Sequence, residues 1–178
     1  GVLMATLTAY RIGHMFNGVV VTAPAFKVSD KLAGDTIKKI GMFISEHLPK
    51  FPVVSGGIDP LFANNPQLRG LNDPMSLRYR PVTARLGAET LTAIEQVFNE
   101  IEKSTYPMLI LHGDDDRLTV LPGSQRFYEK AVSKDKTFVP LKDIRHDLVH
   151  DARSEEIIGG HVLSFFNERL EMTKKNKK

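Results

Sequence analysis

The sequence predicts an α/β fold built on a parallel sheet, and two observations carry this prediction. Three consecutive valines at residues 19–21 stand between Gly18 and Pro24, as in a strand that is buried on both faces of a parallel sheet. Residues 84–170 then alternate helix and strand patterns with short connections, and this order is typical of parallel strands joined by right-handed crossovers.

The individual elements follow from the spacing of apolar residues. A helix is expected over the first residues, where Val2, Leu3, Leu7 and Tyr10 recur at helical spacing before Gly13. The predicted order after residue 84 is a helix at 85–103, a strand at 108–111, a helix at 123–133, a strand at 137–141 and a closing helix at 154–170.

Residues 27–83 differ from the segments on either side. Ile37, Ile40 and Ile44 have helical spacing, and about thirty residues rich in Pro, Gly and Asn follow. Irregular stretches of this length inside a compact domain are usually lids or binding loops. The chain therefore divides into core at 1–26, a helical and loop cap insertion at 27–83, core at 84–170 and a basic tail at 171–178.

The composition limits the classes of partner. The 178 residues have a formal net charge of +3, and four of the 24 basic residues are lysines within the last five positions. Without them, 20 basic residues stand against 21 acidic ones, so the basic pI reflects the tail and no nucleic-acid partner is expected. Cysteine is absent, which excludes disulfides and thiolate catalysis.

The sequence carries no pattern for membrane insertion or export. No apolar run reaches the roughly 18–20 residues that a bilayer requires, and the first residues lack the charged start of a signal peptide. A cytoplasmic location is therefore expected, with a weak contact between the lysine tail and an anionic membrane surface as the alternative.

Polar clusters follow the strands at 108–111 and 137–141, where ligands bind in parallel sheets. The first cluster contains Asp114, Asp115 and Asp116, and the second contains His146. Since adjacent parallel strands end roughly 5 Å apart, an acid and this imidazole can meet there, with the acid orienting the ring. Spacing alone leaves open which aspartate takes part and whether these acids only cap the next helix.

Four segments of the chain are similar to monoacylglycerol lipase-like α/β-hydrolases. PMLILHGDDDRLTV resembles the segment around the catalytic acid of that family, and SKDKTFVPLKDIRHDLVHD resembles its histidine segment. VVVTAPAFKV resembles the strand after the nucleophile helix, and LNDPMSLRYRPVTARLGAETLTAIEQV resembles the connection from cap to core. The resemblance covers nearly the whole chain and implies the α/β-hydrolase fold, with Asp116 as catalytic acid and His146 as base.

The nucleophile of that family is missing from this sequence. No Gly-x-Ser-x-Gly elbow occurs, and the resemblance places the serine two or three residues before Gly1, with the oxyanion-hole donors also outside the chain. Ser55, beside two glycines, is expected to form a turn. We therefore expect these residues to be inactive alone, with an unpaired edge on the strand at 18–23 that the missing amino-terminal half of the protein completes.

The resemblance implies a carboxylic ester hydrolase that acts on monoacylglycerol or lysophospholipid without a cofactor. Ala25, Phe26 and Leu118 are the residues expected to line the acyl-chain pocket. A small-ester or phenolic-ester esterase on the same fold is the first alternative, and a non-catalytic fragment or paralogue is the second.

Zinc binding is a rival chemistry for His146. The run from His146 to His150 resembles the H-E-x-x-H zinc motif with Asp147 in place of Glu. That motif requires a helix, whereas this run follows a strand, so no metal ligand is predicted. His112 and His14 are expected to be structural or solvent-facing.

Overall fold

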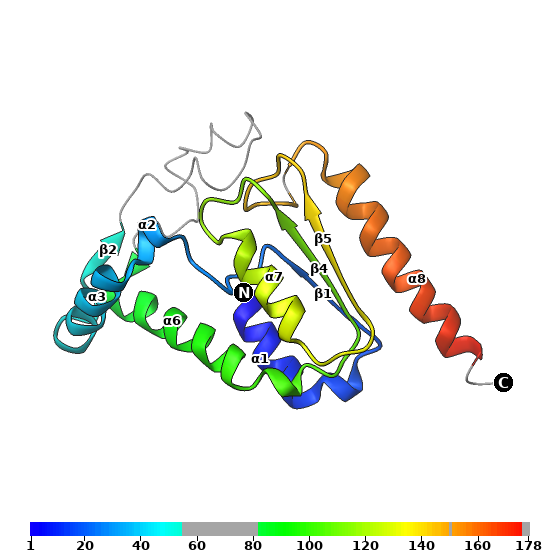
Figure 1. The fold of residues 1–178 in the computed structure, drawn as a ribbon, viewed down its shortest axis with the longest axis horizontal. Coiled ribbons are helices and arrows are strands. Elements are labelled where there is room, and N and C mark those ends of the chain that lie inside the picture. Colours follow the sequence, from blue (N-terminus) through cyan, green and yellow to red (C-terminus); the bar gives the residue numbers. More distant parts are fainter. Residues whose placement is uncertain (55–81, 150, 176–178) are drawn as a thin grey trace.

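The computed structural model describes residues 1–54, 82–149 and 151–175. Its centre is a parallel sheet of β1 (Val19–Thr22), β4 (Met108–Gly113) and β5 (Lys136–Leu141), in the order β1-β4-β5 (Figure 1). All six residues of β4 are buried, because this strand has a neighbour on each side and helices over both faces. The predicted parallel α/β core is therefore confirmed.

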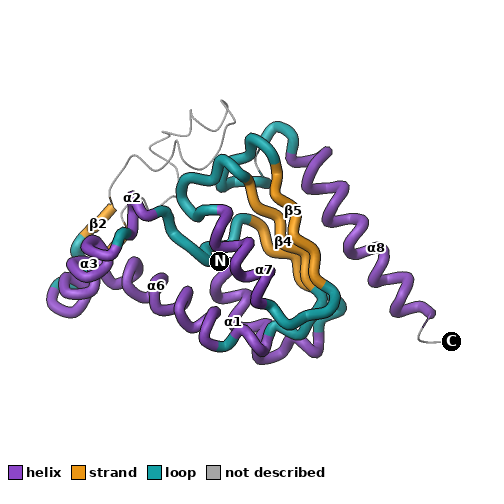
Figure 2. The backbone as a smooth tube through the Cα atoms, in the orientation of Figure 1, coloured by secondary structure: helices purple, strands orange, loops and turns teal. Residues whose placement is uncertain are grey.

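Helices cover the two faces of the sheet (Figure 2). The helices α1 (Val2–Ile12), α6 (Ala84–Asn99) and α7 (Leu121–Lys130) lie on one face, where their side chains pack with Met108 and Ile110. The helix α8 (Gly160–Lys175) lies on the other face, where Phe165 packs with Leu109 and Leu111. Successive β4 residues thus enter opposite halves of the core, as the two-residue period of a strand dictates.

Short helical turns extend three of these elements. A 3-10 turn, Gly13–Met15, follows α1, and another, Ile101–Lys103, follows α6. A π-helical turn, Glu155–Gly159, precedes α8. The helix α8 itself continues to Lys175, five residues beyond its predicted end and into the stretch expected as a basic tail.

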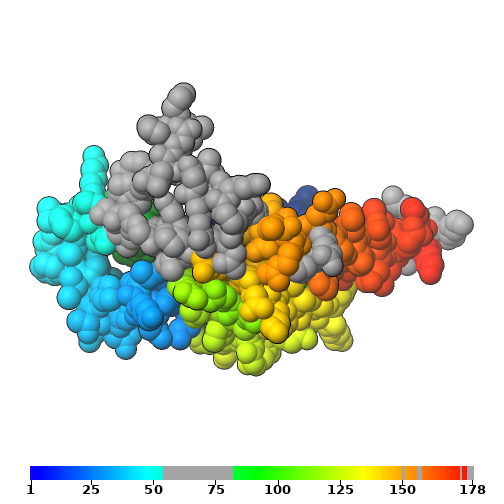
Figure 3. Space-filling model, turned by 90° about the horizontal axis from the view of Figure 1, so that it is seen from above, coloured from blue at the N-terminus to red at the C-terminus, as the bar shows by residue number. Residues whose placement is uncertain are grey.

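The cap segment contributes α2 (Asp30–Ala33), α3 (Asp35–His47) and a small antiparallel pair, β2 (Pro52–Val54) with β3 (Val82–Thr83). The helix α3 packs along α6, and α3 and α8 lie at opposite ends of the molecule (Figure 1 and Figure 3). Ile37 and Ile40 of α3 are 50% and 55% exposed, although their spacing is that of a buried face. They line a cavity, described below, instead of a closed core.

Two apolar patterns in the sequence differ from what the structure buries. Val132, which follows the end of α7 at Lys130, is apolar but 49% exposed. On the closing helix, Leu163 and Phe166 are apolar but exposed, and Phe165 is the buried aromatic residue. The residues of this segment that pack on the sheet, Ile158, Val162 and Phe165, recur at ordinary helical spacing, so the buried face passes through Phe165 and not through Phe166.

Among the strands in the described ranges, β1 pairs with β4 alone, so only one of its two edges is paired there. This pairing matches the arrangement expected for residues 18–23, with the other edge of β1 open within the described part of the chain. Whether further chain completes that edge stays a prediction.

Gly113 ends β4 where the chain leaving β5 crosses it closely. A Cβ atom at Gly113 would lie 2.1 Å from the carbonyl oxygen of Ile144, which is far inside van der Waals contact. Because the two segments lie so close, two backbone hydrogen bonds join them. Asp114 N donates to the Leu141 oxygen at 3.0 Å, and Asp115 N donates to the Ile144 oxygen at 3.1 Å. A side chain at Gly113 would therefore force the two loops apart.

We predict that Gly113→Ala lowers the free energy of unfolding by about 2 kcal/mol or more, because the backbone of Ile144 must move. The matched control is Gly87→Ala in α6, where an added Cβ meets nothing within 4 Å. Helix propensity predicts that this control raises stability by up to about 1 kcal/mol. Urea unfolding of both variants measures the difference, and equal midpoints would contradict the proposed close approach.

Candidate active site

The candidate site lies at the carboxyl ends of β4 and β5. These strands pair in parallel to their last residues, with Gly113 opposite Leu141, so the loops that follow leave the sheet side by side. The first loop carries residues 114–119 and the second carries residues 142–149. The polar clusters predicted from the sequence therefore meet at one edge of the sheet, as the parallel order requires.

Asp116 and His146 are in contact at this edge. The Oδ2 atom of Asp116 lies 2.9 Å from Nδ1 of His146. The Asp116 side chain is completely buried, whereas the imidazole of His146 is 22% exposed. A buried carboxylate that binds one nitrogen of a partly accessible imidazole is the arrangement of the acid and base in a serine hydrolase triad.

The neighbouring aspartates of the run are bound elsewhere. Asp114 Oδ1 accepts a hydrogen bond from the backbone N–H of Asp143 at 2.7 Å, and Asp143 has a left-handed φ of 57°. Asp115 forms ion pairs with Arg117 at 2.9 Å and with Arg145 at 3.3 Å. These two acids tie the two loops together, which leaves Asp116 as the acid of this run that contacts His146.

The turn after Asp116 satisfies its carboxylate. Oδ1 accepts hydrogen bonds from the backbone N–H groups of Leu118 and Thr119, each at 2.9 Å. Oδ2 accepts one from the Thr119 hydroxyl at 2.9 Å, and this hydroxyl oxygen also lies 3.0 Å from Nδ1 of His146. Thr119 was not singled out from the sequence, because its role depends on a turn that brings residue 119 back onto residue 116.

A second histidine approaches Asp116. Nε2 of His112 lies 3.1 Å from Oδ2 of Asp116, and both side chains are fully buried. Burial raises the pKa of the Asp116 carboxyl, but hydrogen bonds from His112 and His146 more than offset this effect and hold the pKa well below its usual range. The carboxylate is therefore ionised at neutral pH. His112, expected to be structural or solvent-facing, belongs to the interior of the site.

The first residues of the cap are joined by hydrogen bonds to the turn at residues 116–119, which we call the acid turn. The backbone N–H of Ser29 donates to the Leu118 oxygen at 3.0 Å, and that of Val120 donates to the Lys27 oxygen at 2.9 Å. An antiparallel bridge between Val28 and Thr119 lies between them. Residues 27–29 and 118–120, which we call the clasp, thus connect the first chain of the cap to the residues that hold Asp116.

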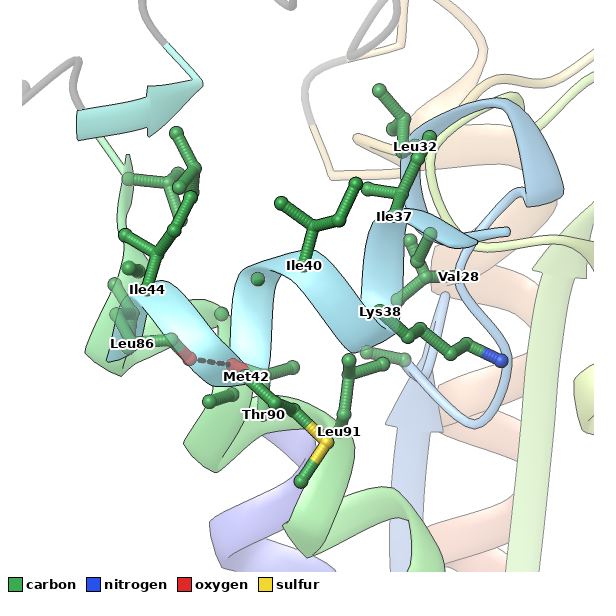
Figure 4. Close-up of a pocket in the computed structure, with 18 of the residues that line it drawn as sticks. Val28, Leu32, Ile37, Lys38, Ile40, Met42, Ile44, Leu86, Thr90 and Leu91 are labelled. Carbon is green, nitrogen blue, oxygen red and sulfur yellow. Dashed lines mark hydrogen bonds between the residues drawn. The ribbon is translucent and has the colours of Figure 1, made fainter. Parts of the chain in front are cut away.

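His146 opens onto an apolar cavity of about 640 Å³ between the core and the cap. Figure 4 shows the side chains of the cap and of α6 that gather around it, among them Leu32, Ile40 and Leu91. Ala25, Leu118 and Thr119 form the wall beside His146. The cavity walls therefore include two of the three residues predicted to bind an acyl chain.

Phe26 takes a different place from the one predicted for it. It is 2% exposed and stacks on Phe127, with ring centroids 4.2 Å apart, in the core beneath the cavity. It lines a separate hollow with Phe98 rather than the cavity beside His146. Ala25 and Phe26 lie beyond the end of β1 at Thr22, in a bend where the backbone N–H of Phe26 donates to the Pro24 oxygen at 2.8 Å, so Ala25 lines the cavity and Phe26 enters the core.

The remaining hypotheses from the sequence concern a zinc motif, Ser55 and His150, and contact with a membrane. Residues 146–149 form bends and a turn, so the helix that a zinc motif would need is not present in this part of the described chain. Ser55 and His150 lie outside the described residues. No helix in the described ranges is long and apolar enough to span a membrane, and contact of the lysine tail with a membrane surface stays a prediction.

The depressed pKa of Asp116 predicts a specific pH dependence of stability. Its ionised form is favoured by folding, so its contribution is fully present above the ordinary pKa of 3.8 and is lost as the pH falls below that value. We predict that stability falls more steeply between pH 5 and pH 3 in the wild type than in Asp116→Asn, by at most about 1.4 kcal/mol per pH unit. Urea midpoints against pH measure this, and parallel curves would contradict it.

Comparison with known proteins gives the family. Residues 1–153 match Hydrolase_4, described as serine aminopeptidase, S33. A putative monoglyceride lipase of Schizosaccharomyces pombe is 29% identical over 152 residues, which are 80% of this chain and 38% of that protein. An uncharacterised abhydrolase domain-containing protein of Dictyostelium discoideum is 25% identical over 163 residues, which are 90% of this chain and 17% of that protein.

Solved structures agree with the sequence match. The crystal structure of Paleococcus ferrophilus monoacylglycerol lipase superposes with a TM-score of 0.80 at 26% identity, over 93% of this chain and 64% of that one. The chain thus spans less than two thirds of the length of these relatives. Its parallel sheet, helical layers and cap are those of an α/β-hydrolase. The chain belongs to the Hydrolase_4 family of serine hydrolases.

Proposed function

We propose that this chain supplies the acid and the base of a Ser-His-Asp triad in a carboxylic ester hydrolase of the monoacylglycerol lipase type. The observation that carries the proposal is the contact of the buried Asp116 carboxylate with His146 at the wall of an apolar cavity. The serine and the oxyanion hole are proposed to come from chain that precedes Gly1, since the elbow sequence is absent from the 178 residues.

Each nitrogen of His146 has its own role in the proposed mechanism. Asp116 accepts a hydrogen bond from Nδ1, so Nε2 carries the lone pair and acts as the base. Nε2 takes the proton of the serine as its oxygen attacks the ester carbonyl, and then gives a proton to the leaving alcohol. A water molecule then attacks the acyl-enzyme, with Nε2 of His146 again as the base, and the carboxylic acid is released as the serine regains its proton. Asp116 stays ionised throughout and stabilises the imidazolium.

The cavity favours an ester with an acyl chain over a peptide. Its volume of about 640 Å³ is in the range of small-molecule sites, and its walls are largely aliphatic. An aminopeptidase must bind a substrate ammonium group, and the described residues that line this cavity include no carboxylate and one cation, Lys38. The names of the S. pombe relative, a putative monoglyceride lipase, and of the Paleococcus structure, a monoacylglycerol lipase, support monoacylglycerol as the substrate, and lysophospholipid is the second substrate that the proposal includes.

The first test is hydrolysis of a monoacylglycerol by the full-length protein that carries this chain. We expect turnover that His146→Ala lowers by about 10⁴- to 10⁶-fold, because the serine loses its base. We expect the 178 residues alone to be inactive. His161→Ala, on the surface of α8, is the matched control and should leave the rate unchanged. Turnover that survives His146→Ala would refute the triad.

The second test concerns the acyl chain. Gly41 lines the cavity and has nothing within 4 Å of an added Cβ, so Gly41→Leu fills space without a clash at its Cβ. We predict that it lowers kcat/KM for long acyl chains at least about tenfold, the effect of a few methylene groups of binding, and spares acetyl esters.

Lys39→Leu is the control for that substitution, because it adds a leucine to α3 at an exposed position outside the cavity wall. Chain-length profiles of both variants are measured with p-nitrophenyl esters from two to sixteen carbons. Wild-type activity confined to short or phenolic esters would favour the esterase alternative, and cleavage of amino-acid p-nitroanilides would favour a peptidase.

A further inference from the structure

His112 is the second imidazole of the site and has no part in the triad. It lies near the end of β4, fully buried, with a polar atom close to each ring nitrogen. Nδ1 lies 2.7 Å from the Ser124 hydroxyl of α7. Nε2 lies 2.8 Å from the Thr119 carbonyl oxygen and 3.1 Å from Oδ2 of Asp116. The ring therefore links the sheet, the acid turn and α7.

These partners select one tautomer of the neutral ring. A carbonyl oxygen can only accept a hydrogen bond, so Nε2 of His112 must carry the hydrogen that Thr119 receives. In the neutral ring Nδ1 is then an acceptor, and the buried Ser124 hydroxyl donates to it. The Nε2 hydrogen is left between the Thr119 oxygen and Oδ2 of Asp116 and is shared by both.

We propose that His112 is a positioning residue, which holds Oδ2 of Asp116 toward His146 by donating from Nε2 to that oxygen and to the turn that carries it. The proposal rests on the proposed function for its kinetic consequence. Oδ1 is fixed by the backbone N–H groups of Leu118 and Thr119, and Oδ2 receives donors from Thr119, His112 and His146.

Loss of the His112 donor has two effects on this arrangement. The Thr119 carbonyl becomes a buried acceptor without this donor, so the 116–119 turn keeps the hydrogen bond from Asp116 N to the Gly113 oxygen but loses the one from the His112 side chain of β4. Oδ2 keeps the Thr119 hydroxyl and His146 but loses its donor from β4, so the carboxylate can rotate about Oδ1, which its two backbone N–H groups still hold. Such a rotation misaligns Nε2 of His146 without changing the cavity that binds the acyl chain.

Two substitutions separate the two nitrogens of His112. Gln places its amide nitrogen about where Nε2 lies and can donate to Asp116 and Thr119. Asn places its amide near Nδ1, so it can meet Ser124 but does not reach Asp116. Both variants shorten or narrow the side chain and keep it polar, so their comparison isolates the donor to Asp116 from general packing.

The kinetic experiment uses the full-length protein and a monoacylglycerol. We expect His112→Asn to lower kcat by about ten- to hundredfold with KM changed less than about twofold, which is the cost of a misplaced catalytic group. We expect His112→Gln to stay within about threefold of the wild type. Equal losses in both variants, or no loss in either, would overturn the positioning role.

Proton and nitrogen NMR of histidine-labelled protein gives a readout that does not depend on activity. The wild type and His112→Gln should show the same downfield Nδ1–H signal of His146 bound to Asp116, and His112→Asn should shift or broaden it. The wild-type His112 should show the Nε2–H form, and Ser124→Ala should change its Nδ1 signal. An Nδ1–H form of His112 would refute the proposal.

The two arms distinguish the two proposals. If the wild-type protein hydrolyses no ester, the proposed function fails, while the NMR comparison still decides whether His112 positions the Asp116–His146 contact. If the wild type is active and the His146 signal is the same in all three proteins, the function stands and the role of His112 is structural only.

Discussion

The Asp116 carboxylate is the group around which this end of the molecule is arranged. A buried charge is costly unless it is compensated, and here the compensation comes from three separate parts of the chain. The 116–119 turn offers two backbone N–H groups and a hydroxyl, β4 offers His112, and the loop after β5 offers His146. Each of these parts is held in place by its contact with the carboxylate, and the carboxylate is ionised because of them.

The close crossing at Gly113 makes this compensation geometrically attainable. The loop after β5 passes so near the end of β4 that the Ile144 oxygen occupies the space of a Cβ. Asp114 and Asp115 then secure the crossing from the side, through Asp143 and the two arginines. Two of the three consecutive acids, Asp114 and Asp115, therefore join the loops, and the third, Asp116, contacts the imidazole of His146.

The sequence predicted the elements correctly where the spacing of apolar residues alone distinguishes a helix from a strand. The three consecutive valines at residues 19–21 and the alternation of helix and strand patterns over residues 84–170 predicted the parallel sheet and the edge where Asp116 and His146 meet. Spacing could not choose among residues 114–116, because three consecutive residues in a turn point in unrelated directions; the family resemblance made that choice. Phe26 was misplaced because it lies in a bend beyond the end of β1, where no hydrophobic period tells which way a side chain points. Thr119 was not singled out and the contacts of His112 could not be specified, since the partners of both residues depend on turn geometry.

The clasp between residues 27–29 and 118–120 also separates the molecule into a constant part and an exchangeable part. It ends at Ser29, before α2 begins at Asp30, so the chain beyond it can change in length and shape while the acid turn keeps its hydrogen bonds. Insertions or deletions after Ser29 can therefore change the cavity over Asp116 and His146 in the course of evolution. A change of substrate then requires no change in the contacts that compensate the buried Asp116 carboxylate.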